Sequence, residues 1–265
     1  PNLYRLRTSV YLNGKLCDAV VSRIGIRSIE FRGADGLYIN GKPFGDKLMG
    51  VNRHQDYAYI GNAVPNNLHW LDVKKMRDAG FRIIRSAHYP QDPAFMDACD
   101  ELGMFIIVAT PGWQYWNPEP VFEERILSDI RNMVRRDRNH PSVLLWEPVL
   151  NETAFPESFA QNAYRATHEE YPAPGCYAAI DDKSKGAMGY DVVYTAPKNE
   201  AFYRNAGKSC FTREYGDCVD DWNSHNSYSR VAREWGEEPQ IRQAQHYARK
   251  DYGGSLTVDQ FCKSP

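Results

Sequence analysis

The sequence lacks several features that mark particular classes of protein. Its six cysteines form no CxxC pair and no closely spaced set, so neither a zinc ribbon nor a small disulfide-stapled fold is indicated. Lys+Arg 32 against Asp+Glu 34 gives a formal net charge of -2, with none of the basic excess typical of nucleic-acid-binding proteins. No apolar run approaches the roughly 20 residues that a membrane-spanning helix needs. We therefore expect no nucleic-acid partner and no membrane partner.

What the sequence does contain is enough apolar material for one large α/β domain with a little left over: 265 residues, of which 42% are hydrophobic. Residues Tyr4–Leu12 alternate between apolar and polar, and Asn13-Gly14 separates them from a second alternating run that ends near Ile24. This pattern predicts a β-hairpin. The chain opens without Met, so we interpret residues 1–28 as the last strands of an immunoglobulin-like β-sandwich that begins upstream.

From residue 29 onward the pattern is that of a parallel α/β domain, which we assign to 29–265. A short hairpin, Ile29–Phe31 and Leu37–Ile39, precedes alternating strands and helices. The expected strands are Leu48–Asn52, Arg82–Ser86, Met104–Ala109, Val143–Val149, Cys176–Ile180, Val192–Thr195 and Ser209–Arg213. The expected helices are Leu68–Ala79, Pro93–Leu102, Val121–Arg138, Phe155–Glu169 and a stretch around Arg230–Lys250. Seven strands are one short of a closed (β/α)₈ TIM barrel, so we expect that fold without its eighth strand in this chain.

Polar residues cluster where the predicted strands end. They are Asn52-Arg53-His54, Arg85 to Pro90, Asn151-Glu152 and Arg213 to Gly216. In a barrel of parallel strands these ends meet at one face, where the catalytic residues of such folds lie. The sequence therefore predicts an active site made from the first, second, fourth and seventh strands.

Two longer motifs make a family resemblance specific. The stretch Arg82–Pro90 resembles the first signature of glycoside hydrolase family 2, and Asp137–Glu152 resembles its acid/base signature almost position for position. Gly50–His54 and Glu214–Gly216 are similar to further landmarks of the family, in the same order. The resemblance implies a (β/α)₈ barrel with the acid/base after strand four and the nucleophile after strand seven. It also implies an immunoglobulin-like domain before the barrel.

The resemblance assigns the acid/base role to Glu152 and the nucleophile role to Glu214. Cleavage of a glycosidic bond with retention needs two carboxyl groups about 5–5.5 Å apart, one protonated and one ionised. Glutamates that follow strands four and seven can face each other across a barrel mouth. Arg213 and Arg85 are expected to keep the nucleophile ionised through their positive charge.

Further residues are predicted to hold the sugar. Asn151 resembles the family asparagine that binds the 2-hydroxyl group, and Tyr194 is a candidate for holding the nucleophile. The remaining predicted substrate-binding residues are His54, His88, Arg85, Trp113, Trp116 and Trp222. Histidines can bond sugar hydroxyls and tryptophans can stack on a pyranose face. For each tryptophan, packing within a loop is the alternative interpretation.

The sequence departs from the family pattern at three places. Some β-galactosidases of the family bind magnesium through an acidic residue after the third strand, but the run here is Ile107–Gly112. Because that run offers no carboxylate ligand, we predict no metal there and no cofactor. Arg82 replaces the usual Asn, and Glu147 replaces the usual Gly or Ser. A buried carboxylate at Glu147 needs a partner, for which a barrel arginine is a candidate.

The working hypothesis is a retaining exo-β-glycosidase acting on a carbohydrate, with β-galactosidase favoured. A β-glucuronidase normally carries an Asn-x-Lys element, whereas Asn205 and Lys208 are one residue too far apart. β-Glucuronidase, β-mannosidase and a catalytically inactive glycan-binding barrel remain alternatives. The sequence leaves the oligomeric state and the compartment open, although a polysaccharide target would favour a periplasmic or secreted protein.

Overall fold

The computed structural model describes residues 2–45, 48–57, 59–194 and 207–214. The chain divides into two compact units, one made of Pro1–His54 with Pro65–Arg213 and the other of Gln55–Val64 with Glu214–Pro265. The first unit contains all the strands and helices given below. The predicted helical stretch Arg230–Lys250 lies outside the described residues.

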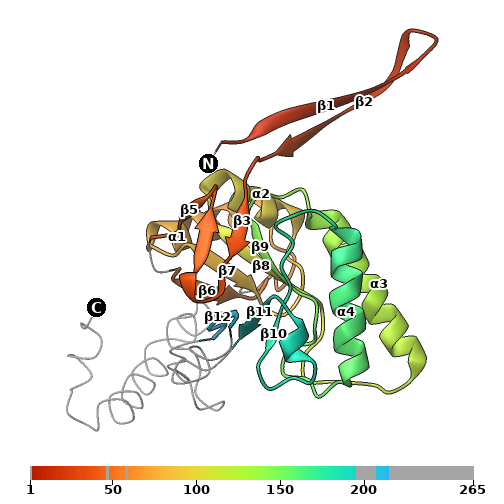
Figure 1. Ribbon diagram of the computed structural model, residues 1–265. Helices are drawn as coiled ribbons and strands as arrows, with labels where there is room; N and C mark the ends of the chain where they lie inside the picture. The colour runs from red at the N-terminus through yellow and green to blue at the C-terminus, as the bar shows by residue number, and fades with distance from the viewer. Residues whose placement is uncertain (1, 46–47, 58, 195–206, 215–265) are drawn as a thin grey trace. The chain divides into compact units, whose positions relative to one another are not determined.

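Parallel strands form the centre of the first unit (Figure 1). Four pair in chain order: β6 (Gly50–Arg53), β7 (Ile83–Ser86), β8 (Phe105–Ala109) and β9 (Val143–Glu147). Three more follow, also in parallel: β10 (Ala179–Asp181), β11 (Val192–Tyr194) and β12 (Ser209–Phe211). A parallel bridge between Trp146 and Ala178 joins the two sets. The seven predicted strands are therefore confirmed, and within the described residues β12 is not paired with β6.

Four helices pack against the outer side of these strands. They are α1 (Asn66–Asp78), α2 (Pro93–Leu102), α3 (Pro120–Asp137) and α4 (Glu157–Glu170). Local chemistry fixes the bounds of α2, because the Asp92 side chain accepts a bond from the Ala94 N–H at 2.8 Å and Gly103 ends the helix at a φ of 68°. Buried side chains from helices and strands, among them Phe95, Ile106 and Met133, form the core between the two layers.

A small antiparallel sheet closes the end of the barrel where the strands begin. It consists of β3 (Ile29–Phe31), β4 (Leu37–Ile39) and β5 (Lys42–Pro43). Ile29 is 2% exposed and packs in one cluster with inward-facing residues such as Leu145 and Val192. The Tyr177 hydroxyl, just before β10, donates to the Ile29 carbonyl at 3.2 Å. The apolar interior is thus filled at this end, and the polar strand ends lie at the other.

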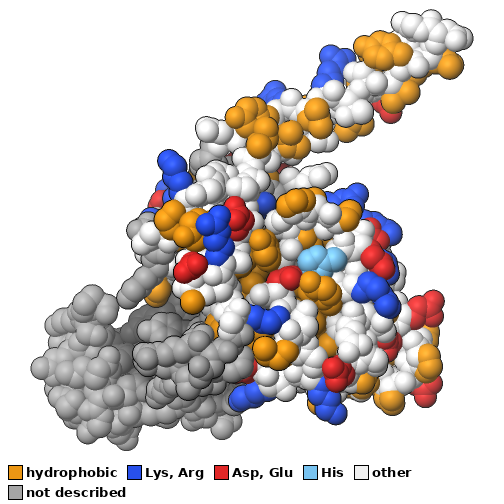
Figure 2. All heavy atoms as spheres, in the orientation of Figure 1, with side chains coloured by type: hydrophobic (Ala, Val, Ile, Leu, Met, Phe, Trp, Pro, Cys, Tyr) orange, Lys and Arg blue, Asp and Glu red, His pale blue; other side chains and the backbone are white. Residues whose placement is uncertain are grey.

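The predicted N-terminal hairpin is confirmed as β1 (Tyr4–Leu12) and β2 (Lys15–Ile24). Asn13 and Gly14 both have positive φ, 48° and 76°, as a two-residue hairpin turn requires. Large apolar side chains on both strands are exposed, Leu12 by 67%, and Figure 2 shows them along the whole hairpin. The assignment of this hairpin to a β-sandwich stays a prediction.

The predicted end of the fourth strand is wrong. We expected the fourth strand to reach Val149, but β9 ends at Glu147. Pro148 follows directly, and because proline has no N–H it cannot continue the ladder of hydrogen bonds.

None of the described helices combines the length and apolar character that crossing a membrane would take.

A buried carboxylate anchors the start of β9. Asp100 on α2 accepts a bond from the Ser142 N–H at 3.0 Å and lies 2.7 Å from Nδ1 of His140. Burial disfavours a charged His140, but its bond with Asp100 outweighs burial and raises the pKa of the imidazole above its usual range. The folded state therefore favours the protonated imidazole, so this pair stabilises the fold more below the pKa of the imidazole than above it, as long as Asp100 is ionised.

We predict that Asp100→Asn destabilises the protein more at about pH 6 than at about pH 9. The stabilisation by a raised histidine pKa is complete below the unfolded pKa and is lost as pH rises through the folded pKa. The loss at the lower pH should be about 1–3 kcal/mol, measured by thermal or urea unfolding. Asp78→Asn, which removes an exposed pair with Lys74, is the matched control. An equal loss at both pH values would contradict the prediction.

Candidate active site

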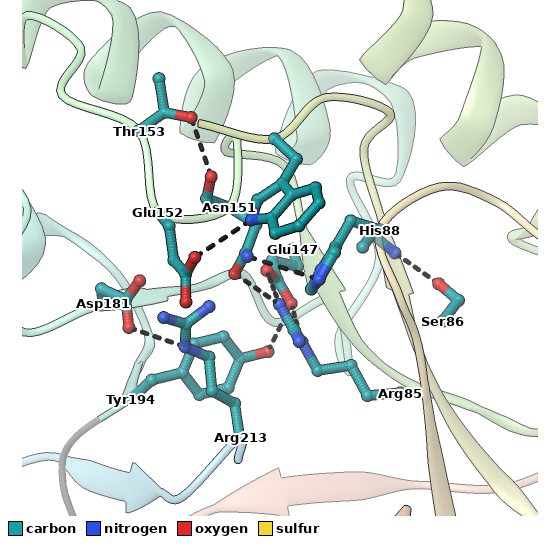
Figure 3. A network of polar contacts seen from close by, with 12 residues as sticks. Arg85, Ser86, His88, Glu147, Asn151, Glu152, Thr153, Asp181, Tyr194 and Arg213 are labelled. Atoms are coloured by element: carbon teal, nitrogen blue, oxygen red, sulfur yellow. Dashed lines mark hydrogen bonds and ion pairs between the residues drawn. The ribbon is translucent and has the colours of Figure 1, made fainter. Parts of the chain in front are cut away.

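Polar side chains from four strands meet at the edge where the strands end (Figure 3). The group consists of Arg85 on β7, Glu147 on β9, Asp181 on β10, Tyr194 on β11, and Asn151 and Glu152 in the loop after β9. Because all seven strands are parallel, their carboxyl ends face the same side. The structure thus brings together most of the polar residues that the sequence predicted for this face.

Arg85 and Glu147 form the buried centre of this group. The guanidinium binds both carboxylate oxygens, at 2.6 Å from Nε and 2.5 Å from Nη2, and both residues are 2% exposed. The Tyr194 hydroxyl donates to Glu147 at 3.3 Å. Burial opposes a charge on Glu147, but the Arg85 charge outweighs it and lowers the pKa of this carboxyl. The expected barrel-arginine partner of Glu147 is therefore Arg85.

Glu152 is held by the loop that follows β8. The Trp113 indole and the Gln114 amide both donate to its Oε2, at 3.0 and 2.7 Å, and the Gln114 N–H donates to the Asn151 carbonyl at 3.0 Å. The Trp113 bond first, and the Gln114 bond with it, hold the pKa of Glu152 below its usual range. Glu152 has a positive φ of 47° and an exposed side chain. The result is a fixed, solvent-accessible carboxylate that can exchange a proton with a bound molecule.

A row of rings borders this carboxylate. The His88 ring lies 5.4 Å from that of His54 and stacks on Trp113 with 5.6 Å between centroids. Burial first, and the nearby Arg85 charge second, lower the pKa of His88 to about 4. His88 is therefore neutral at pH 7, and Trp113 is 45% exposed. Neutral rings with exposed faces and polar edges suit a polyhydroxylated ligand.

A second guanidinium lies at the same edge. Arg213, just after β12, pairs with Asp181 at 3.0 Å between Nε and Oδ1. Burial raises the pKa of Asp181 to about 6 despite the Arg213 charge. The structure gives Arg85 and Arg213 the carboxylate partners Glu147 and Asp181, and their expected role beside Glu214 stays a prediction. Asp181 and Gln114 were not predicted as site residues. The acidic residue at a strand end was a signal for Asp181, and the position after Trp113 was the one signal for Gln114.

Among the described residues of the first unit, Trp116 is the predicted site residue that packs away from this group. Trp116 packs between Phe122 and Phe159, with ring centroids 5.4 and 4.9 Å away, in the core between α3 and α4. Glu214 belongs to the second unit, and Trp222 lies outside the described residues. The packing of Trp116 matches the alternative given for the tryptophans, and the role of Glu214 stays a prediction.

One cluster among the described residues has the spacing of metal ligands: Asp97, Asp100 and His140, with ligand atoms within 4.8 Å of one another. It lies at the start of β9, at the opposite end of the barrel from Glu152. Arg23 pairs with Asp97 at 2.6 Å, and Asp100 is bonded to His140 and Ser142. These internal partners already compensate the carboxylates, so we interpret the cluster as structural.

Comparisons with known proteins agree with this geometry. The family described as "Glycosyl hydrolases family 2, TIM barrel domain" matches residues 29–173. A β-galactosidase of Thermoanaerobacterium thermosulfurigenes is 36% identical over 174 residues, which are 65% of this chain and 24% of that protein. A β-galactosidase of Thermoanaerobacter pseudethanolicus is 33% identical over 64% of this chain and 22% of its own length. The chain thus spans about a quarter of the length of these relatives.

Solved structures show the same similarity. A β-glycosidase from Bacteroides vulgatus superposes with a TM-score of 0.67 at 27% identity, covering 79% of this chain and 28% of that one. A β-glucuronidase from Bacteroides uniformis gives a TM-score of 0.63 at 27% identity, covering 72% of this chain and 26% of its own. The relatives therefore include proteins named for two different sugars.

We predict that Gln114→Met raises the pKa of Glu152, because it removes a donor that favours the charged carboxylate. Titration of ¹³C-labelled glutamate side chains by NMR, assigned with Glu152→Gln, measures the change. Gln161→Met is the matched control, since Gln161 donates to Glu157 on the surface of α4. A Glu152 titration that Gln114→Met leaves unmoved would show that this hydrogen bond has no electrostatic effect.

Proposed function

This chain belongs to glycoside hydrolase family 2, and on that basis we propose that it carries the catalytic face of a retaining exo-β-glycosidase acting on β-galactosides. The observation that supports this most directly is the Asn151-Glu152 pair. It follows β9 inside the matched stretch 29–173, with the Glu152 carboxylate exposed beside His88 and Trp113. An exposed, fixed carboxylate at a barrel strand end is suited to general acid/base catalysis.

In the proposed reaction Glu152 is the general acid/base and Glu214 is the nucleophile. Glu152 gives its proton to the glycosidic oxygen while the Glu214 carboxylate attacks the anomeric carbon, so the leaving alcohol departs and a glycosyl ester forms. Glu152, now a carboxylate, then takes a proton from water as that water attacks the anomeric carbon and frees Glu214. The double inversion retains the β configuration.

This cycle requires the pKa of Glu152 to change between the two steps. The bonds from Trp113 and Gln114 favour the carboxylate, which suits the second step but not the first. A neighbouring ionised Glu214 would raise the pKa of Glu152 in the free enzyme, because two negative charges at close range oppose each other. Once Glu214 is esterified that charge is gone, and Glu152 becomes a base again.

Charge balance supports a neutral sugar over a uronate. Arg53 is paired with Asp72, Arg85 with Glu147, and Arg213 with Asp181. Glu152 adds a further carboxylate, so carboxylates outnumber guanidinium groups among these described residues. A glucuronide would bring another negative charge to them, whereas a galactoside brings none. β-Glucuronidase, β-mannosidase and a glycan-binding barrel without activity are the alternatives.

The contacts to the sugar are proposed as follows. Asn151 binds the 2-hydroxyl group, His54 and His88 bond other hydroxyls, and Trp113 stacks on the ring.

We also propose that residues 1–28 end an immunoglobulin-like domain. The apolar side chains of β1 and β2 are exposed, as expected for strands of a β-sandwich that lack the second sheet to pack against.

We predict that chromogenic β-galactosides are hydrolysed at least about tenfold faster than the matching glucuronide, as kcat/KM, because a uronate adds about 1–2 kcal/mol of charge repulsion. Steady-state assays with nitrophenyl galactoside, glucuronide and mannoside measure this. A preference for the glucuronide would contradict the substrate assignment but not the reaction type. Binding of these sugars without turnover would favour the glycan-binding alternative.

We predict that Glu152→Gln and Glu214→Gln each lower kcat, by about 10²–10⁴-fold for the acid/base and at least as much for the nucleophile. With a good leaving group, azide should restore turnover in Glu152→Gln, because this anion needs no general base to attack the glycosyl ester. In Glu214→Gln, which forms no ester, azide can act only by attacking the anomeric carbon directly, so any product is the α-glycosyl azide, whereas Glu152→Gln gives the β-glycosyl azide. Glu157→Gln, on the exposed first turn of α4, is the control. No rescue of Glu152→Gln, an α-azide from Glu152→Gln or a β-azide from Glu214→Gln would contradict the assignment of roles.

A further inference from the structure

Glu147 stands where the family signature usually has Gly or Ser, and it is a buried charge. It is 2% exposed, both of its oxygens are bound by Arg85, and Tyr194 donates to one of them. A buried ion pair does not in itself imply a gain in stability, because the cost of desolvating both charges can exceed their attraction. Stability alone therefore does not explain why a buried carboxylate stands at position 147.

The hydrogen bonds of Arg85 suggest a role for the buried pair. Its Nη2 donates to Glu147 Oε1 at 2.5 Å and to Asn151 Oδ1 at 3.0 Å. The bidentate contact with Glu147 fixes the plane of the guanidinium. That plane determines the position at which Oδ1, the side-chain amide oxygen of Asn151, can accept a hydrogen bond from Nη2. The planar fork of Arg85 thus connects a strand residue with a loop residue that carries no charge.

The orientation of the Asn151 amide follows from this contact. Since Oδ1 faces Arg85, the NH₂ group faces the other way, and its Nδ2 lies 3.5 Å from Nε2 of His88. His88 is neutral at pH 7, because burial and the Arg85 charge lower its pKa to about 4. Asn151 is 3% exposed, so its side chain has little room to turn over.

We propose that Glu147 is a positioning residue for Asn151. Through Arg85 it keeps the Asn151 oxygen turned inward and the NH₂ group turned toward the substrate, as a donor to the 2-hydroxyl of the sugar. This inference rests on the proposed function. It differs from a purely structural role because it concerns one hydroxyl of the substrate rather than the whole fold.

The test compares Glu147→Gln with the wild-type full chain on a nitrophenyl β-galactoside and its 2-deoxy counterpart. A glutamine turns an N–H toward one guanidinium N–H, so the bidentate contact is lost and Arg85 no longer fixes Asn151. We expect the kcat/KM ratio of the 2-hydroxy to the 2-deoxy substrate to fall about 10–100-fold, since misplacing a binding group by about 1 Å can cost that much. Glu147→Asp, which keeps the charge and one bond, should give an intermediate ratio.

Two controls separate positioning from structure. Glu170→Gln breaks another bidentate pair, with Arg135, far from the site between α3 and α4, and should leave the ratio unchanged. In an Asn151→Ala background, Glu147→Gln should not lower the ratio further. Equal slowing of both substrates, or a further fall in that background, would overturn the proposal.

The outcome remains interpretable if the proposed function fails. A wild-type chain that hydrolyses neither substrate would count against that function and not against the positioning role. A crystal structure of Glu147→Gln, or of Glu147→Asp if the former does not fold, then decides. Displacement of the Asn151 oxygen from Arg85 supports the proposal, and an unchanged contact overturns it.

Discussion

Parallel pairing of seven strands is the constraint on which the other features of this protein depend. Because each strand from β6 to β12 runs in the same direction, each delivers its last residue to the same edge, and apolar side chains fill the opposite end under Ile29. Arg85, Glu147, Asp181 and Tyr194 are the last or next-to-last residues of their strands. Their proximity follows from the topology, although they are spread over more than a hundred positions of the sequence.

At that edge, the polar residues differ in charge and in burial. The deepest groups are the buried Arg85–Glu147 pair, whose hydrogen bonds act in a low effective dielectric. Above it lies Asn151, which is neutral, and then Glu152, which is exposed and held by two neutral donors from the loop after β8. Glu152 is therefore the exposed carboxylate of this group, and the charges of Arg85 and Glu147 beneath it are already paired.

Much of the fold could be predicted because local chemistry determines it. Asn13-Gly14 requires a tight turn, and Asp92, Pro93 and Gly103 define both ends of α2. The strand-end polar residues were predicted from position alone. The end of β9 was placed too late because its apolar run continues past Pro148, whose missing N–H stops the ladder.

The partners of side chains were harder to predict, since they depend on contacts between distant loops. The donation from Gln114 to Glu152 joins residues 38 positions apart, and no periodicity reports it. Trp116 and Trp113 look alike in the sequence, yet Trp116 is partly buried and packs on Phe159, whereas Trp113 borders Glu152. The expected role of the arginines was incomplete for the same reason, because Asp181 could not be recognised as a partner of Arg213 without the geometry.

The segment that joins the N-terminal hairpin to the barrel contacts the start of β9. Gly25 approaches Pro141 so closely that a Cβ atom on the glycine would lie 2.5 Å from the proline Cβ. The Arg27 guanidinium binds the carbonyl oxygens of Pro141 and Val143, at 2.6 Å each. Gly25 and Arg27 thus bind the start of β9, the strand whose other end leads into the Glu152 loop. A side chain at position 25 would therefore displace the start of β9, the strand whose last residue is Glu147.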